Sequence, residues 1–201
     1  MVTNTIAVMQ RENARLQAEN QALQRVLGKL REFVQTLHTL VERARSADDT
    51  ALMPLLHEIF SHALDLLNAP EGSLLLLDDQ TNELQFVLVQ GALGEQLVGY
   101  RIPANEGIAG WVVQNAQATL VRDVRRDSRF SQNIDDAFKF RTQSIAAAPI
   151  MGDSRVLGVL EALNQPVDEP FSDTDLMLLS LLCRFAGEVL ADITRTKSET
   201  A

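Results

Sequence analysis

The sequence predicts an α+β fold, in which an antiparallel sheet is flanked by helices and preceded by a long N-terminal coiled-coil helix. A seven-residue repeat of apolar side chains runs through residues 6–45 without an interrupting Pro. Farther along, two pairs of short apolar runs, each separated by turn residues, are typical of β-hairpins. Helical segments lie before and after these hairpins, an order that favours helices gathered on one side of a sheet.

The N-terminal helix is predicted by its heptad pattern, which we interpret as a parallel two-stranded coiled coil. Ten of the twelve core positions are apolar, and the two exceptions, Asn13 and Asn20, are both a positions. A buried Asn pairs with its mate in a parallel dimer and so fixes register and strand number. The alternative is a single amphipathic helix packed on its own domain. The a positions are Ile6, Asn13, Asn20, Leu27, Val34 and Val41, and the d positions are Met9, Leu16, Leu23, Leu30, Leu37 and Ala44.

The apolar stripe widens along this helix, because the g positions become apolar at Val26, Phe33 and Leu40. A wider stripe contacts more than one partner, and a four-helix arrangement with another helix pair is the simple solution.

The remaining elements follow in order from local signals. Asp48-Asp49-Thr50 begins a helix that has Pro54 in its first turn, where the missing N–H costs little. Asn68-Ala-Pro-Glu-Gly72 ends this helix, and turn residues separate the strands of each hairpin. The predicted strands are 72–78, 83–90, 119–124, 144–151 and 156–164; the predicted helices are a short one at 108–117, a turn within 133–140 and a last one at 173–194. We divide the chain into a coiled-coil helix (1–47), one domain (48–195) and a polar tail (196–201).

Composition and charge exclude several classes of function. The single Cys, Cys183, excludes a disulfide framework and a Cys-cluster zinc site. The net charge of −9 is the sum of +1 on residues 1–50 and −10 on residues 51–201, and an acidic domain repels nucleic acid. The sequence has neither a secretory signal nor an apolar run of about 20 residues, so we expect a cytoplasmic protein without membrane contact.

Several strings of residues resemble a GAF domain. They are "IPANEGIAGWVVQNAQATLVRDVRRDSRF", "FRTQSIAAAPI", "LGVLEALNQ" and "FSDTDLMLL". The similarity covers most of residues 50–195 and is greatest to the cyclic-nucleotide-binding type. A PAS domain is the alternative fold, but it does not account for these strings. In GAF dimers the first and last helices commonly bundle, so the resemblance implies a homodimer through residues 6–45 and the C-terminal helix.

The same resemblance implies a set of ligand-binding residues. They are Ser73, Val89, Gln90, Ile108, Ala109, Ser131, Asp135, Phe138 and Thr142. The polar members can hydrogen-bond a purine, ribose or phosphate, and Ile108 and Phe138 can enclose a ring. Val89 stands where the best-known binders carry an aromatic residue.

Two further segments leave alternatives open. The segment 122–142, which we name the lid segment, holds six of the eleven basic residues of 51–201. These residues suit a small anionic ligand, or they belong to a solvated loop of mixed charge. The two glycines of "EGIAG" (106–110) suit either a phosphate at a helix start or a tight turn with close packing.

The motif that follows the last strand departs from the cyclic-nucleotide type. Asn164, Phe171 and Asp175 match it, but Gln165 replaces a Lys that pairs with the Asp in that family. Gln165 can offer Asp175 only a neutral donor. Helix capping alone accounts for Ser172 and Asp175, and for Phe171 and Leu176 at the neighbouring apolar positions.

We therefore expect a non-enzymatic, dimeric signalling module that senses a small ligand, with a nucleotide as one candidate. The alternative is a ligand-free adaptor that uses the domain for dimerisation. We expect neither a metal nor a cofactor, because the three His lie on the first two helices and Cys183 lies in the apolar stripe of the last helix. No effector domain follows residue 195, so the signal is expected to pass to a partner protein, unless the chain is a fragment of a longer one.

Overall fold

The computed structural model describes residues 2–46, 52–166 and 170–200. They divide into two units, Met1–His38 and Thr39–Ala201. The predicted helix start at residues 48–50 lies outside the described residues.

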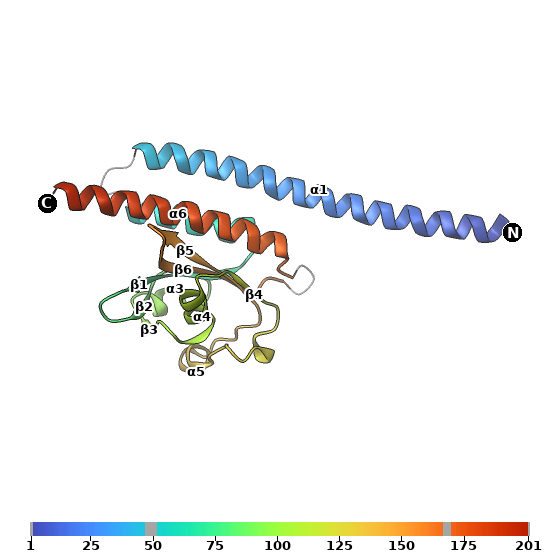
Figure 1. The fold of residues 1–201 in the computed structure, drawn as a ribbon. Coiled ribbons are helices and arrows are strands. Elements are labelled where there is room, and N and C mark those ends of the chain that lie inside the picture. Colours follow the sequence, from blue (N-terminus) through green and yellow to red (C-terminus); the bar gives the residue numbers. More distant parts are fainter. Residues whose placement is uncertain (1, 47–51, 167–169, 201) are drawn as a thin grey trace. The chain divides into compact units, whose positions relative to one another are not determined.

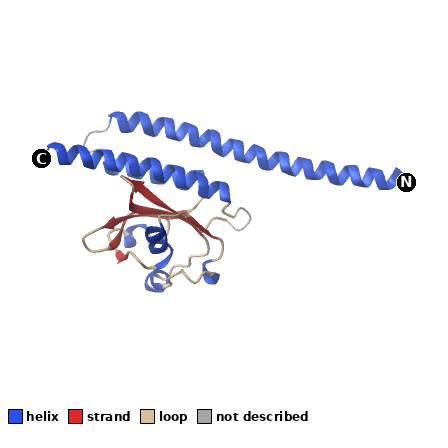
Figure 2. Cartoon of the chain, viewed as in Figure 1, coloured by secondary structure: helices blue, strands red, loops and turns tan. Residues whose placement is uncertain are grey.

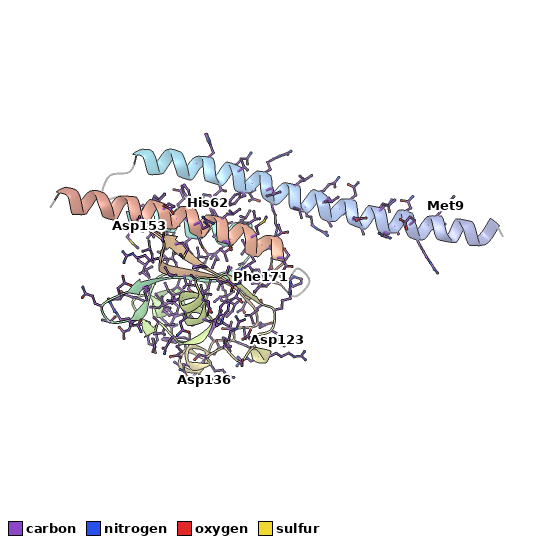
Figure 3. The ribbon with its side chains drawn as sticks, in the orientation of Figure 1. Met9, His62, Asp123, Asp136, Asp153 and Phe171 are labelled. Atoms are coloured by element: carbon purple, nitrogen blue, oxygen red, sulfur yellow. The ribbon has the colours of Figure 1, made fainter. Side chains whose placement is uncertain are left out.

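The N-terminal unit consists of helix α1, which spans Val2–Ser46 and continues a few residues into the second unit. It confirms the predicted long helix. Leu16 and Leu23 at d positions, and Leu27 and Val34 at a positions, are each more than half exposed, as is Met9 near the N-terminal end of α1 (Figure 3). The predicted coiled coil and helical bundle stay predictions, because they concern contacts beyond this unit.

The second unit is built on a six-stranded antiparallel sheet with the order β3-β2-β1-β6-β5-β4 (Figures 1 and 2). The central strands belong to the two predicted hairpins, which pair with each other through β1 and β6. The strands are β1 (Glu71–Asp78), β2 (Glu83–Gln90), β3 (Arg101–Pro103), β4 (Thr119–Val121), β5 (Ile145–Gly152) and β6 (Arg155–Leu163). The helices are α2 (Leu52–Leu66), α3 (Gly94–Leu97), α4 (Gly107–Asn115), α5 (Asn133–Phe138) and α6 (Asp173–Thr200), with a 3-10 turn η1 (Val124–Arg126).

Helices cover both faces of this sheet, so the expectation of helices on one side is wrong. Helices α2 and α6 lie on one face, while α3, α4 and α5 lie on the other (Figure 1). Strand alternation supplies an apolar surface to each face. Leu75 and Val159 belong to the core beneath α4, and their neighbours Leu74 and Leu160 are fully buried as well.

Local chemistry sets the ends of several elements. The β5–β6 turn has Asp153 and Ser154 at positive φ, as a two-residue hairpin turn requires. Ser172 caps α6: its Oγ accepts from the Asp175 N–H at 3.3 Å, and Asp175 accepts in return from the Ser172 N–H at 2.8 Å. This reciprocal pair confirms the predicted capping. Helix α6 continues to Thr200, through most of the predicted polar tail.

Helix α6 packs very closely on strand β5. A Cβ added to Gly187 would meet the backbone of Met151, and one added to Gly152 would meet the carbonyl oxygen of Gly187. Only glycine permits this approach of helix backbone to strand backbone. Strands β5 and β6 are therefore held between α6 on one face and α4 on the other.

Within the part of the chain that the structure describes, no helix is long and apolar enough to cross a membrane.

Candidate functional site

A cavity of about 100 Å³ lies between the sheet and the lid segment. Strands β1 and β6 form its floor, β2 and the loop after it form one side, and the first turn of α4 forms another. The lid segment closes it with Phe130, Ile134 and Phe140. Asp123 and Asp136 of this segment lie on the side of the sheet away from His62 of α2 (Figure 3).

Eight of the nine predicted ligand residues line this cavity. They are Ser73, Val89, Gln90, Ile108, Ala109, Ser131, Asp135 and Thr142. Phe138 is not among the lining residues: its ring meets the ring of Tyr100 edge-on, with centroids 5.3 Å apart. Phe138 is the last residue of α5, and its ring contacts Tyr100 in the loop before β3 instead of the cavity.

Asp135 is buried and binds other parts of the lid segment. Its carboxylate accepts hydrogen bonds from the Thr142 hydroxyl at 2.7 Å, the Thr142 N–H at 3.1 Å and Arg125 Nη2 at 2.7 Å. Three donors satisfy most of the acceptor capacity of a carboxylate. Asp135 therefore holds the lid segment together, whatever it offers to a ligand.

A second polar contact fastens the lid segment to α4. Glu106 precedes α4 and accepts from the Ser131 hydroxyl at 2.6 Å and from the Asn133 side-chain amide. Glu106 thereby joins the start of α4 to the start of α5. Opening the cavity at this point requires these hydrogen bonds to break or to be shared with solvent.

The glycines of "EGIAG" have structural roles. Gly107 has a φ of +69°, which favours glycine, and a Cβ on Gly110 would lie 2.5 Å from the Asn105 carbonyl carbon. They allow a tight turn and close packing, the second of the two alternatives above. The turn also brings the first residues of α4 to the cavity wall.

Four of the six basic residues of the lid segment, Arg122, Arg125, Arg126 and Arg129, pair with carboxylates. Arg125 binds Asp135, and Arg129 binds Asp127 at 2.7 Å while its guanidinium lies 4.5 Å from the centre of the Trp111 ring. Hydrogen bonds from Arg129 lower the pKa of Asp127. Among the described residues that line the cavity, none is Lys, Arg or His. The positive charge counted in the sequence therefore does not face the cavity.

Glu161 is a cavity residue that the sequence reasoning missed. It lies on β6, is 9% exposed and accepts a hydrogen bond from the Ser73 hydroxyl at 3.1 Å. Burial raises the pKa of Glu161 to about 7. One signal was available: Glu161 is the only charged residue in the apolar run VLGVLEAL.

Gln165 contacts the residue that follows α2 instead of the capping carboxylate. Its amide donates to the Leu67 carbonyl oxygen at 2.6 Å, and its Oε1 is buried without a partner among the described residues. Gln165 therefore ties the end of β6 to the end of α2.

Comparisons with known proteins identify the fold. A model of the GAF domain family matches residues 51–190. The dual 3′,5′-cyclic-AMP and -GMP phosphodiesterase 11 of Drosophila melanogaster is 31% identical over an alignment of 147 residues, and the match covers 66% of this chain and 10% of that protein. The chain thus spans about a tenth of that relative's length.

Three solved structures resemble the chain in fold. The GAF domain of a phosphoenolpyruvate-protein phosphotransferase from Coxiella burnetii has a TM-score of 0.71 at 18% identity, covering 83% of this chain and 97% of its own. The corresponding Acinetobacter domain has a TM-score of 0.66 at 22% identity, covering 81% and 94%. Free methionine-R-sulfoxide reductase from Neisseria meningitidis, solved with its substrate, has a TM-score of 0.66 at 19% identity, covering 82% and 91%.

Proposed function

This chain belongs to the GAF domain family, and we propose on that premise that it is a dimeric regulatory module that binds a small ligand beneath its lid segment. GAF domains are generally signalling or ligand-binding modules. The ligand changes the packing of the lid segment, and α6 passes the change to a partner protein. A nucleotide is the first candidate ligand, because the phosphodiesterase similar to this chain acts on cyclic AMP and cyclic GMP.

The observation that carries the proposal is the cavity itself. Its lining includes eight of the nine predicted ligand residues, from segments as far apart as Ser73 and Thr142, and few hydrogen bonds close it. The Glu106 contacts to Ser131 and Asn133 are partly exposed, so a ligand can exchange with solvent by disturbing them. A mostly apolar hollow with a small number of polar groups is the usual form of a ligand site.

A route for the signal runs through strand β6. Glu161 faces the cavity from this strand, and its neighbour Leu160 is fully buried, on the opposite face by strand alternation. That opposite face lies beneath α2 and α6 (Figure 1). If the cavity has two states coupled to two packings of α2 and α6, a ligand that binds one state more tightly shifts the equilibrium toward its packing. The shift is limited by the difference in binding free energy.

The test is calorimetric titration of the apo protein with cyclic AMP and cyclic GMP, together with denaturation of freshly purified protein to release any bound UV-absorbing molecule. Ala109→Leu fills the cavity from α4, while Ala137→Leu makes the same change at an exposed position of α5. We expect binding or release from the wild type and Ala137→Leu, and neither from Ala109→Leu. The absence of both from the wild type contradicts the proposal.

Dimerisation is proposed through α1 of a second copy. The exposed stripe of Leu16, Leu23, Leu27 and Val34 is what a coiled-coil seam leaves open in one chain, and Asn13 and Asn20 at a positions favour a parallel pair. Asn13→Cys should then form a disulfide across the axis, and Ala18→Cys, on the outer face of the same turns, should not. Failure of Asn13→Cys to cross-link in a dimer shown by light scattering contradicts the parallel arrangement.

A regulatory role is favoured over an enzymatic one. A solved neighbour of this fold is a free methionine-R-sulfoxide reductase, but the only Cys of this chain, Cys183, is fully buried and burial raises the pKa of its thiol. A buried thiol that stays protonated is neither a nucleophile nor an exchange partner.

The second candidate is a ligand-free adaptor, favoured by Asp135. The Asp135 carboxylate accepts hydrogen bonds from Arg125 and Thr142, so it has little acceptor capacity left for a ligand. In that case Ala109→Leu stabilises the domain and leaves recruitment of the partner protein unchanged.

A further inference from the structure

The floor of the cavity holds a carboxylate that the protein itself only half satisfies. Glu161 Oε2 accepts from the Ser73 hydroxyl, a neutral donor, and Glu161 Oε1 accepts no hydrogen bond from the described residues. Ser73 is 2% exposed, so neither member of the pair is well solvated. A buried carboxylate without a charged partner is costly, so this site favours a ligand that supplies one.

Every ionisable side chain that lines the cavity is acidic. Its ionisable lining residues are Glu71 on β1, Glu106 before α4, Asp135 on α5 and Glu161 on β6. Asp135 has a cationic partner in Arg125, but Glu71 and Glu106 have neutral donors, from Asn164 and from Ser131 and Asn133. A cation entering the cavity is attracted by these groups, and an anion is repelled.

The first turn of α4 does not reverse this preference. Helix N-termini attract anions, and Ile108 and Ala109 bring this one to the cavity wall. However, Glu106 immediately precedes the helix, so its carboxylate already places negative charge at that end. A second anion there must approach Glu106 and gains no basic side chain from the cavity wall.

We propose that the cavity binds a small planar organic cation with N–H donors, such as an amidine or a protonated aminoheterocycle, and that Glu161 accepts its hydrogen bonds. Phe86, Ile108, Phe130 and Phe140 supply the apolar walls for the ring. The space, about 100 Å³, is several times the roughly 10–15 Å³ that one water needs by the same kind of measure, which suits a ring with one substituent. The inference rests on the proposed function, because it names the ligand class of the same cavity, and it puts an organic cation ahead of the anionic nucleotides as the first candidate ligand.

The charge of Glu161 makes this binding depend on pH. Its pKa of about 7 in the empty cavity means that the carboxyl is protonated below pH 7 and ionised above it. A cationic ligand stabilises the ionised form, so it binds more tightly as pH rises through 7 and releases a proton near pH 7. Of the other acidic residues that line the cavity, Glu71 and Glu106 add negative charge, while Arg125 offsets the charge of Asp135.

The experiment uses three probes of one shape: benzamidine, benzamide and benzoate, which carry charges of +1, 0 and −1. Calorimetry on the 201-residue chain at pH 6 and pH 8 measures each affinity. We expect benzamidine to bind at least tenfold more tightly than benzoate at pH 8, and to lose several-fold in affinity at pH 6. Benzoate binding as tightly as benzamidine, or no benzamidine binding at 10 mM, overturns the inference.

Two variants and one control locate the effect. Glu161→Gln should remove the preference for benzamidine and its pH dependence, whereas Asp79→Asn, the same change at an exposed ion pair with Arg155, should keep both. Ser73→Ala removes a hydrogen bond that lowers the pKa of Glu161, so it should move the pH midpoint of benzamidine binding upward even if Glu161→Gln does not fold. An unchanged pH profile in Ser73→Ala overturns the role of Glu161.

The outcome separates this inference from the proposed function. Cyclic-nucleotide binding without benzamidine binding leaves the sensor proposal intact and overturns the cation-binding inference. Failure of the wild type to bind any probe or nucleotide and to release any UV-absorbing molecule contradicts both.

Discussion

Replacing Glu161 with Gln should remove part of the pH dependence of the free energy of unfolding. The pKa of Glu161 rises from 4.5 to about 7 on folding, because the side chain is removed from water and receives only the Ser73 hydrogen bond. Since the folded pKa is the higher one, the stability contribution is full below pH 4.5. It falls as pH rises, because the unfolded chain ionises first, and its loss is complete above pH 7.

The magnitude follows from the shift. One pKa unit corresponds to about 1.4 kcal/mol. A rise from 4.5 to about 7 therefore makes folding about 3 kcal/mol less favourable when Glu161 is ionised than when it is protonated. Gln has nearly the same shape and no charge. The free energy of unfolding of the wild type, relative to Glu161→Gln, should therefore fall by about 2–3 kcal/mol between pH 5 and pH 8.

Urea denaturation of both proteins at pH 5, 6, 7 and 8 measures this difference, with far-UV circular dichroism as the signal. Subtracting one curve from the other removes the contributions of all other titrating groups. Asp79→Asn serves as the control, since Asp79 is exposed on the β1–β2 turn and should leave the profile of the wild type unchanged. Parallel pH profiles for the wild type and Glu161→Gln would refute the argument that Glu161 is buried and unpaired.

Three further substitutions test the packing of α6 and of the lid segment. Gly187→Ala should lower the free energy of unfolding by more than about 2 kcal/mol, because its Cβ meets the Met151 backbone; chemical denaturation measures this, and a loss below about 0.5 kcal/mol would contradict the close approach. Asp135→Asn should cost about 1–3 kcal/mol and speed limited proteolysis within the lid segment, since it weakens three hydrogen bonds; proteolysis at the wild-type rate would contradict its holding role. Ser172→Ala should cost about 1 kcal/mol through loss of the α6 cap, against about 0.5 kcal/mol or less for Ser180→Ala, whose hydroxyl donates back to its own helix; equal costs would contradict the cap.

The short elements were harder to predict than the long ones. Strand β3 (Arg101–Pro103) and helix α3 (Gly94–Leu97) were not anticipated, because three or four residues are too few to show a period. The predicted strand at 119–124 stops at Val121, and a 3-10 turn begins at Val124. The side chain of Asp123 caps this turn by accepting from the Arg125 N–H. This hydrogen bond competes with continued strand pairing, and the hydrophobic pattern does not reveal it.

The predicted ligand residues stay a prediction, although most of them lie on the wall of one cavity. Resemblance placed eight of nine residues on the cavity wall but could not tell that Asp135 binds Arg125 and Thr142. It also left out Glu161, and the count of basic residues in the lid segment could not decide between an anion site and a solvated loop of mixed charge. Both points have the same origin, because the role of a side chain depends on which groups lie next to it in the folded structure.

The sequence by itself determined the helical and strand periods, the hairpin turns, the cap at Ser172 and the heptad stripe of α1, because these depend on residues within about one or two turns of each other. Only the tertiary structure decided which carboxylates face the cavity, and which of them find a cation. Ser73 and Glu161 are 88 residues apart in the chain, and the pairing of β1 with β6 brings them together. The pKa of Glu161 and the charge of the cavity follow from that pairing and from burial, which no local pattern specifies.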